Sequence, residues 1–100
     1  MDYIFLTDDN KGRKVMLRKE RWTHITEPRS QHPYMAGYLE EIKDTIRKPD
    51  FIVANKYDEN KMNYCKYLKA RRLYIVVVVK YLNGEGDVIT AFMARNVRRR

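Results

Sequence analysis

The most regular hydrophobic pattern lies near the C-terminal end, where an uninterrupted apolar run is followed by turn residues and a second apolar run. Leu73–Val79 are apolar or aromatic and mostly β-branched, which suits a pleated strand. Because the run has no polar alternation, it predicts a central strand over 73–81 that is covered on both faces. A buried helical turn is the alternative, but four successive valines and the glycines that follow favour a strand.

Turn chemistry follows this run directly. Asn83–Asp87 contains an Asn-Gly pair and two glycines, residues that readily adopt positive φ. Val88–Met93 is then the returning strand. The pattern predicts a β-hairpin as the centre of the domain.

The N-terminal part predicts two short strands and a helix. Residues 2–7 and 14–17 are short apolar runs on either side of a turn cluster. Residues 18–27 place Trp22 and Ile25 at helical spacing toward a core, and a proline follows. His24 lies about 100° from Ile25 around this helix, near the border of the apolar face.

A second helix is predicted over residues 34–48. Pro33 suits its first turn, and the apolar positions form one stripe that ends before Pro49. Residues 51–54 and 62–70 then read as strands, and Arg71-Arg72 as the turn into the central strand. The predicted fold class is α+β, with two N-terminal helices packed on a four-stranded antiparallel sheet.

Composition predicts one globular domain over residues 1–94 and a basic tail over 95–100. The chain has 100 residues, of which 44% are hydrophobic and 34% charged. No apolar run reaches the roughly 20 residues of a membrane-spanning helix, and no signal peptide is visible. A lone Cys65 fits a reducing compartment, so we expect a cytoplasmic location and no membrane partner.

The net charge is +8, from 21 basic and 13 acidic residues. Four of these positive charges lie in the last six residues. The balance favours a polyanionic partner, and a merely solvated basic surface with a tail explains it about equally well.

The residue inventory favours one kind of chemistry. The sequence contains no phosphate-binding loop, nucleophile elbow or metal-ligand spacing, so we expect no metal and no cofactor. His24, His32, a Thr on a late strand and many arginines suit metal-independent cleavage of RNA, whose 2′-OH is the nucleophile. Such a reaction needs a base, an acid and cations beside the phosphate.

Several short motifs follow one another along the chain: Trp22-Thr23-His24-Ile25, His32-Pro33, residues 41–50, the valine strand and Ile89-Thr90-Ala91-Phe92. Their order resembles that of the PBECR domains of phages and mobile elements. The PBECR domains are grouped with barnase, EndoU, the colicin ribonucleases and RelE-type toxins. The resemblance covers about residues 14–93 and implies a barnase/RelE-like fold and nuclease activity.

The resemblance also implies site residues. A His on the first helix corresponds to His24 and a hydroxyl on the last strand to Thr90, with His32 as a further catalytic candidate. Similar sequences often place an acid after His-Pro, whereas Tyr34 follows Pro33 here. The candidate RNA-binding residues are Arg47, Arg71, Arg72, Lys80 and Tyr64.

Each candidate has a structural alternative. His24 and His32 could bond locally at a helix boundary or helix entry, and Thr90 could be an ordinary strand residue. Lys80 and the arginines could only keep the surface soluble, and Tyr64 could pack in the core.

The leading hypothesis is a metal-independent endoribonuclease whose partner is RNA. The protein would be the toxin of a toxin–antitoxin or conflict system, and a small acidic protein would neutralise it. The main alternative is a catalytically inactive module of the same fold that binds RNA or protein. A third interpretation is a structural accessory protein of a phage or mobile element.

Overall fold

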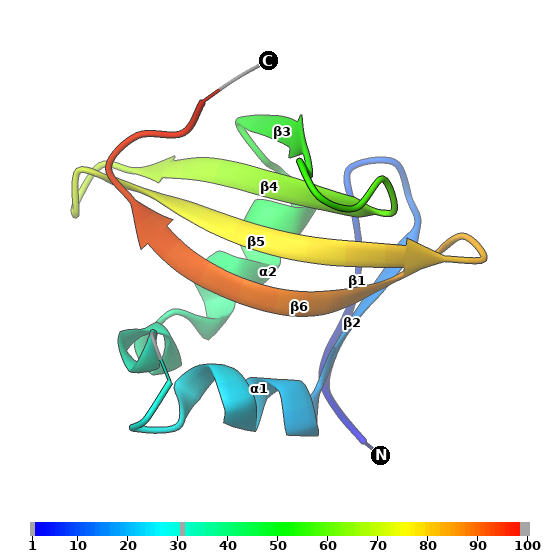
Figure 1. The fold of residues 1–100 in the computed structure, drawn as a ribbon, viewed down its shortest axis with the longest axis horizontal. Helices are drawn as coiled ribbons and strands as arrows, with labels where there is room; N and C mark the ends of the chain where they lie inside the picture. The colour runs from blue at the N-terminus through cyan, green and yellow to red at the C-terminus, as the bar shows by residue number, and fades with distance from the viewer. Residues whose placement is uncertain (1, 31, 99–100) are drawn as a thin grey trace.

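The computed structural model describes residues 2–30 and 32–98 and shows a mixed β-sheet with helices packed against it (Figure 1). The strands are β1 (Tyr3–Asp8), β2 (Lys14–Arg18), β3 (Phe51–Ala54), β4 (Lys61–Leu68), β5 (Leu73–Leu82) and β6 (Glu85–Ala94). The helices are α1 (Lys19–Thr26), the 3-10 helix η1 (Pro33–Gly37) and α2 (Leu39–Arg47). The strand order is β1-β2-β6-β5-β4-β3.

The predicted four-stranded antiparallel sheet is wrong. The sheet has six strands and is mixed, because β1 and β2 form a hairpin that joins it. β2 pairs with β6 in parallel, at Val15 with Gly86 and Met16 with Asp87. The α+β composition therefore remains, but the N-terminal strands belong to the same sheet as the C-terminal ones.

Gly86 explains how β2 can approach β6. A Cβ atom at this position would lie 2.7 Å from Val79 Cγ1, 2.9 Å from Tyr81 Cε1 and 3.1 Å from Val15 Cγ2. At 2.7 and 2.9 Å, the neighbouring side chains would have to shift to admit a Cβ atom. The glycine, which the sequence suggests is only a turn residue, thus permits the close packing of three strands.

The hairpin between β5 and β6 is tighter than predicted. Asn83 and Gly84 have φ values of 54° and 81°, as a two-residue turn of the type I′ class requires. Leu82 pairs with Glu85, so β6 begins three residues before the predicted start at Val88.

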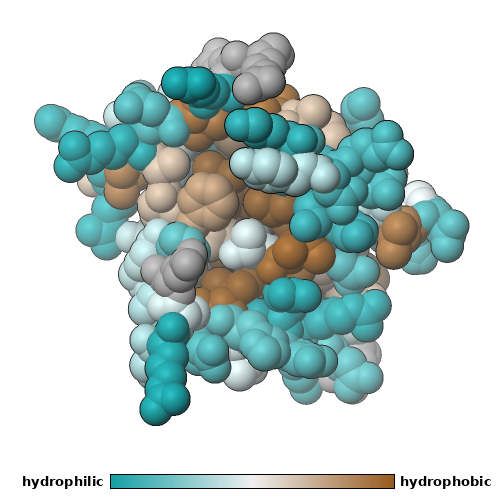
Figure 2. All heavy atoms as spheres, in the orientation of Figure 1, coloured by the Kyte–Doolittle hydropathy of each residue, from teal (hydrophilic) through white to brown (hydrophobic). Residues whose placement is uncertain are grey.

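The central position of β5 is confirmed, because β5 lies between β4 and β6. Ile75, Val77 and Val79 point into the core, which also contains Ile42 and Ile46 of α2. Val76 and Val78 point to the opposite face and are 2% and 7% exposed. Figure 2 shows an apolar patch on this face of the sheet, bordered by hydrophilic side chains.

The two predicted helices are present, but the second is interrupted. α1 begins and ends one residue inside its predicted range. The predicted helix over 34–48 is divided into η1 and α2 at Tyr38, whose φ and ψ of −124° and 27° are not helical. After the break, η1 packs beside α1, and His32 of the connector between them stacks on Phe92 of β6.

Some predictions concern residues outside this description. Arg99 and Arg100 of the predicted tail and residue 31 of the connector lie outside the described residues. None of the described helices is long and apolar enough to cross a membrane.

Candidate active site

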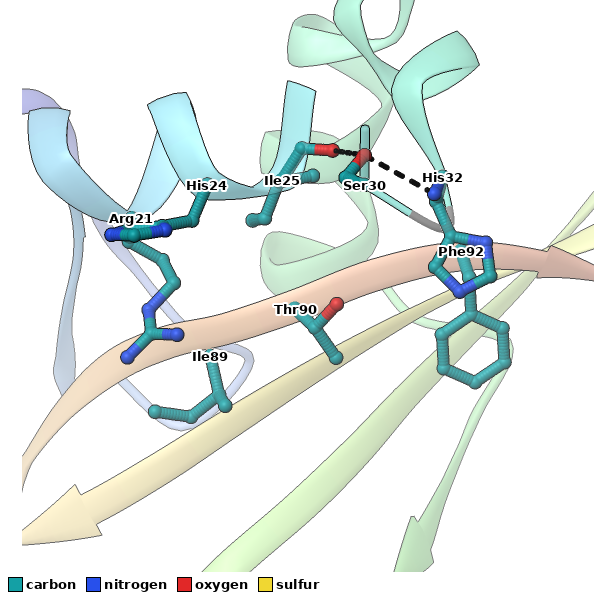
Figure 3. A pocket seen from close by; sticks show the side chains of 8 residues that line it. All are labelled: Arg21, His24, Ile25, Ser30, His32, Ile89, Thr90 and Phe92. Atoms are coloured by element: carbon teal, nitrogen blue, oxygen red, sulfur yellow. Dashed lines mark hydrogen bonds between the residues drawn. The ribbon is translucent and has the colours of Figure 1, made fainter. Parts of the chain in front are cut away.

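A cavity of about 440 Å³ opens between α1, the connector that follows α1, and β6 (Figure 3). β2 pairs with β6 only at Gly86 and Asp87, and α1 lies against β6 as well. The residues that line the cavity are Arg21, His24, Ile25, Ser30, His32, Ile89, Thr90 and Phe92. All three predicted catalytic residues therefore border one cavity, although they come from three different segments.

Helical spacing brings three of the lining side chains together on α1. Arg21 precedes His24 by three residues and Ile25 by four, so they share one helix face. Ile25 is 5% exposed and anchors this face in the core. Arg21 extends from the helix toward Ile89, and it has no hydrogen-bond or ion-pair partner among the described residues (Figure 3).

His24 lies at the border of the cavity. Its side chain is 60% exposed, and its Nε2 is 3.8 Å from Glu20 Oε1, which makes an ion pair only when the ring is protonated. The ring is therefore accessible to a substrate and is not packed in hydrocarbon.

The connector is fixed to the end of α1 by Ser30. Its hydroxyl donates a hydrogen bond of 2.7 Å to the Ile25 carbonyl and accepts one of 3.3 Å from the His32 backbone N–H. The His32 ring stacks on Phe92 of β6, with 5.5 Å between ring centroids and 29° between planes. These contacts hold the imidazole on the side of the cavity opposite to Arg21 (Figure 3).

Tyr34 orients the His32 ring. Its hydroxyl oxygen is 3.1 Å from His32 Nδ1 and accepts a hydrogen bond of 3.1 Å from the Met93 backbone N–H. When Nδ1 carries the His32 proton, both N–H groups donate to this oxygen. Nε2 of His32 has no partner among the described residues, so it is the nitrogen that a substrate can reach.

A β-bulge forms the floor of the cavity. Val78 pairs with Thr90 but Val79 pairs with Val88, which leaves Ile89 as an extra residue in β6. Strict alternation would put Ile89 and Thr90 on opposite faces, whereas both line the cavity. The Thr90 hydroxyl has no hydrogen-bond partner among the described residues and lies between the two histidines in Figure 3.

The charge of the cavity suits an anion. Its lining includes one guanidinium, two imidazoles and two hydroxyls, and the eight lining residues include no carboxylate. Arginine and hydroxyl donors of this kind bind phosphate oxygens, and imidazoles transfer protons near neutral pH.

The basic RNA-binding candidates do not line this cavity. Arg47 ends α2 and is exposed, as is Arg72, whose φ of 55° places it in the turn before β5. Lys80 Nζ lies 3.3 Å from Asp58 Oδ2. Arg71 lines a different cavity, at the end of β6 that follows Phe92.

Tyr64 has no exposed ring face and cannot stack on a base. It is completely buried, and its hydroxyl lies 2.6 Å from that of Tyr81. The Tyr81 hydroxyl donates to Asp9 Oδ2 at 2.7 Å, and Arg13 Nε donates to the same oxygen at 2.7 Å. We therefore remove Tyr64 from the RNA-binding set and assign it to this buried network.

The hydrogen bonds of the buried network shift the pKa values of Asp9 and Tyr81 in opposite directions. Burial alone would raise the pKa of Asp9, but hydrogen bonds from Tyr81, Arg13 and Lys11 lower the pKa below its usual value. Burial and the neighbouring Tyr64 and Asp9 raise the pKa of Tyr81. Asp9 is thus an ionised, fully hydrogen-bonded anchor that ties the turn after β1 to β4 and β5.

Sequence reasoning missed four residues around the cavity. Arg21 had a usable signal, because its spacing from His24 and Ile25 places it on the same helix face. Ser30, Tyr34 and Phe92 had none, since their roles depend on contacts between the connector and β6.

The α+β fold carries a cavity lined by an arginine, two histidines and two hydroxyl groups. The family model described as phage-Barnase-EndoU-ColicinE5/D-RelE like nuclease 2 (PBECR2) matches residues 2–100. The chain therefore belongs to this nuclease-like family, and the predicted PBECR resemblance is confirmed. Searches of the curated proteins and of the solved structures found no match to the chain.

Proposed function

We propose that this protein is a metal-independent endoribonuclease. The observation that supports this most strongly is that Arg21, His24, His32 and Thr90 border one cavity whose lining includes no carboxylate. Family membership independently supports a nuclease. The cavity supplies two proton-transfer groups and a cation, which is what cleavage by the 2′-OH of RNA requires.

The proposed reaction is an in-line transfer at phosphorus. His32 Nε2 takes the proton of the 2′-OH while O2′ forms a bond to phosphorus. The bond from phosphorus to O5′ breaks, and protonated His24 gives its proton to O5′. The products are a 2′,3′-cyclic phosphate and a 5′-OH. The positions of the histidines on opposite sides of Thr90 suit attacking and leaving oxygens that lie on opposite sides of phosphorus (Figure 3).

Arg21 and Thr90 would stabilise the phosphorane. Neither side chain has a hydrogen-bond or ion-pair partner in the described part of the chain, so both can donate to the non-bridging oxygens without losing another bond. Donors directed at developing charge commonly contribute about 10²- to 10³-fold to a rate. Arg47, Arg72 and Lys80 remain proposed contacts to the RNA backbone outside the cavity.

The pH dependence of kcat/KM tests the two histidine roles. A single-site RNA substrate should be cleaved in EDTA with a bell-shaped pH profile. His32→Ala should lower kcat/KM about 10²- to 10⁴-fold and remove the acidic limb, whereas His24→Ala should remove the alkaline limb. Thr90→Val and Thr90→Ser form a matched pair in which only the serine keeps the hydroxyl. If both histidine variants retain the full bell-shaped profile, these roles are wrong.

A catalytically inactive binding module is the second candidate. Its support is Tyr34, which stands where similar sequences often carry an acid. If the protein is such a module, filter-binding should show salt-dependent retention of RNA without any cleavage, both for wild type and for His32→Ala.

A toxin role follows from the nuclease proposal and is tested separately. Production of the wild-type protein in a bacterial host should slow growth, and production of His32→Ala to the same level should not. A neutralising acidic partner would restore growth by covering the basic surface, and it should inhibit RNA cleavage at a 1:1 ratio.

A further inference from the structure

A second cavity, of about 430 Å³, lies at the C-terminal end of β6. Its lining consists of two tyrosines, two arginines and two apolar residues: Tyr34, Tyr38, Arg71, Leu73, Met93 and Arg95. Strand register brings the arginines together, because Tyr74 near the start of β5 pairs with Ala94 at the end of β6. Arg71 lies in the turn before β5, and Arg95 directly follows the last residue of β6.

The two arginines carry unneutralised charge. Neither makes an ion pair within the described residues, and both side chains belong to exposed residues. The Arg71 guanidinium carbon lies 5.6 Å from the centroid of the Tyr38 ring, a cation–π arrangement that leaves the N–H groups available. Arginine beside aromatic rings is the combination with which proteins bind single-stranded nucleic acids.

Tyr34 connects the two cavities. Tyr34 lines the second cavity and is 45% exposed. Its hydroxyl bonds His32, which lines the first cavity, and the Met93 N–H. Phe92 lines the first cavity and Met93, the next residue of β6, lines the second, so the cavities lie on opposite sides of the strand. The Tyr34 hydroxyl bonds the Met93 N–H between them, and a strand that leaves the first cavity reaches the second by crossing the edge of β6 beside Tyr34.

We infer that the second cavity is a subsite for the nucleotide next to the cleaved dinucleotide. Its base packs against Tyr34 and Tyr38, and its phosphate lies between Arg71 and Arg95. The ligand is single-stranded RNA, because a paired base could not turn its face to a tyrosine ring. This inference rests on the proposed function and adds to it a preference for substrates longer than a dinucleotide.

The test compares substrates of two lengths. The double variant Arg71→Ala/Arg95→Ala should lower kcat/KM for a decanucleotide at least about tenfold more than for a dinucleotide. The matched control is Lys11→Ala/Lys56→Ala, which removes two positive charges from turns away from both cavities. Equal losses for both substrate lengths, or equal losses in the double variant and the control, would overturn the subsite.

A binding measurement separates the subsite from the nuclease proposal. The anisotropy of a labelled decanucleotide is followed with His32→Ala protein, with and without the two arginine substitutions. The arginine substitutions should reduce the slope of log K against log salt by about 0.7 for each lost phosphate contact. A selective loss of binding with no cleavage by wild type supports the subsite and contradicts the nuclease. Cleavage by wild type with an unchanged salt slope in the arginine variant contradicts the subsite and supports the nuclease.

Discussion

Tyr34→Phe removes the hydroxyl that lies within hydrogen-bond distance of the His32 ring, and it leaves the aromatic ring of residue 34 in place. The wild-type oxygen is 3.1 Å from both His32 Nδ1 and the Met93 nitrogen. The substitution therefore removes two hydrogen bonds from groups that differ in importance. One belongs to a proposed catalytic ring and the other to an edge N–H of β6.

The two losses have different expected sizes. Tyr34 is 45% exposed, so water can replace the hydroxyl at Met93, and the free energy of unfolding should fall by only about 0.5 to 1 kcal/mol. At His32, the loss leaves both neutral tautomers available and the ring held only by its stacking on Phe92. We expect kcat/KM for RNA to fall about tenfold, which corresponds to about 1.4 kcal/mol of transition-state stabilisation.

The assay measures kcat/KM against pH together with ¹⁵N NMR of the His32 ring. Wild type should show a single tautomer with the proton on Nδ1, and Tyr34→Phe should show a mixture. Tyr57→Phe is the control, because Tyr57 is 88% exposed and its hydroxyl makes no hydrogen bond among the described residues. An unchanged tautomer and an unchanged kcat/KM in Tyr34→Phe would refute the positioning role.

Three further predictions test other parts of the structure. Arg21→Ala should lower kcat/KM about 10²-fold with little change in thermal stability, whereas Arg29→Ala, in the connector, should change neither quantity. Asp9→Asn should lower the free energy of unfolding by about 2 to 3 kcal/mol in urea titrations, because the buried network loses its charged acceptor. The pKa of Asp9 is lower in the folded protein than its usual 3.8, so its stabilisation is present above that pH and lost as the pH falls through the folded pKa. Wild type should therefore lose stability on acidification more steeply than Asp9→Asn, and parallel pH profiles would contradict this. Gly86→Ala should destabilise by about 1 to 3 kcal/mol, because its Cβ would meet Val79 at 2.7 Å, and an unchanged urea midpoint would show that β2 does not need this close approach.

The sequence predicts the local elements well because their causes are local. The β-branched run of β5 and the Asn-Gly turn specify a hairpin, and Pro28 and Pro49 follow the two α-helices. The addition of β1 and β2 to the sheet could not be predicted, since it depends on a parallel pairing of only two residue pairs about 70 positions apart. The role of Gly86 depends on that same pairing.

The residues of the candidate site were also only partly predictable from the sequence. His24, His32 and Thr90 were selected on residue type, position and family resemblance, and they border one cavity. The bulge at Ile89 that turns Thr90 and its neighbour to one side has no sequence signature. Tyr64 had a signal for the core, because alternation in β4 puts it on the same face as Met62 and Leu68, and all three pack with the core.

The most direct test of the nuclease proposal uses two RNAs that differ by one oxygen atom. Both carry a single cleavage site, and one has a 2′-deoxynucleotide at that site. In EDTA, the all-ribose substrate should be cut to a 2′,3′-cyclic phosphate and a 5′-OH, and the deoxy substrate should remain intact. Equal cleavage of both substrates, or cleavage that stops when EDTA is added, would contradict a reaction in which the RNA supplies its own nucleophile to His32.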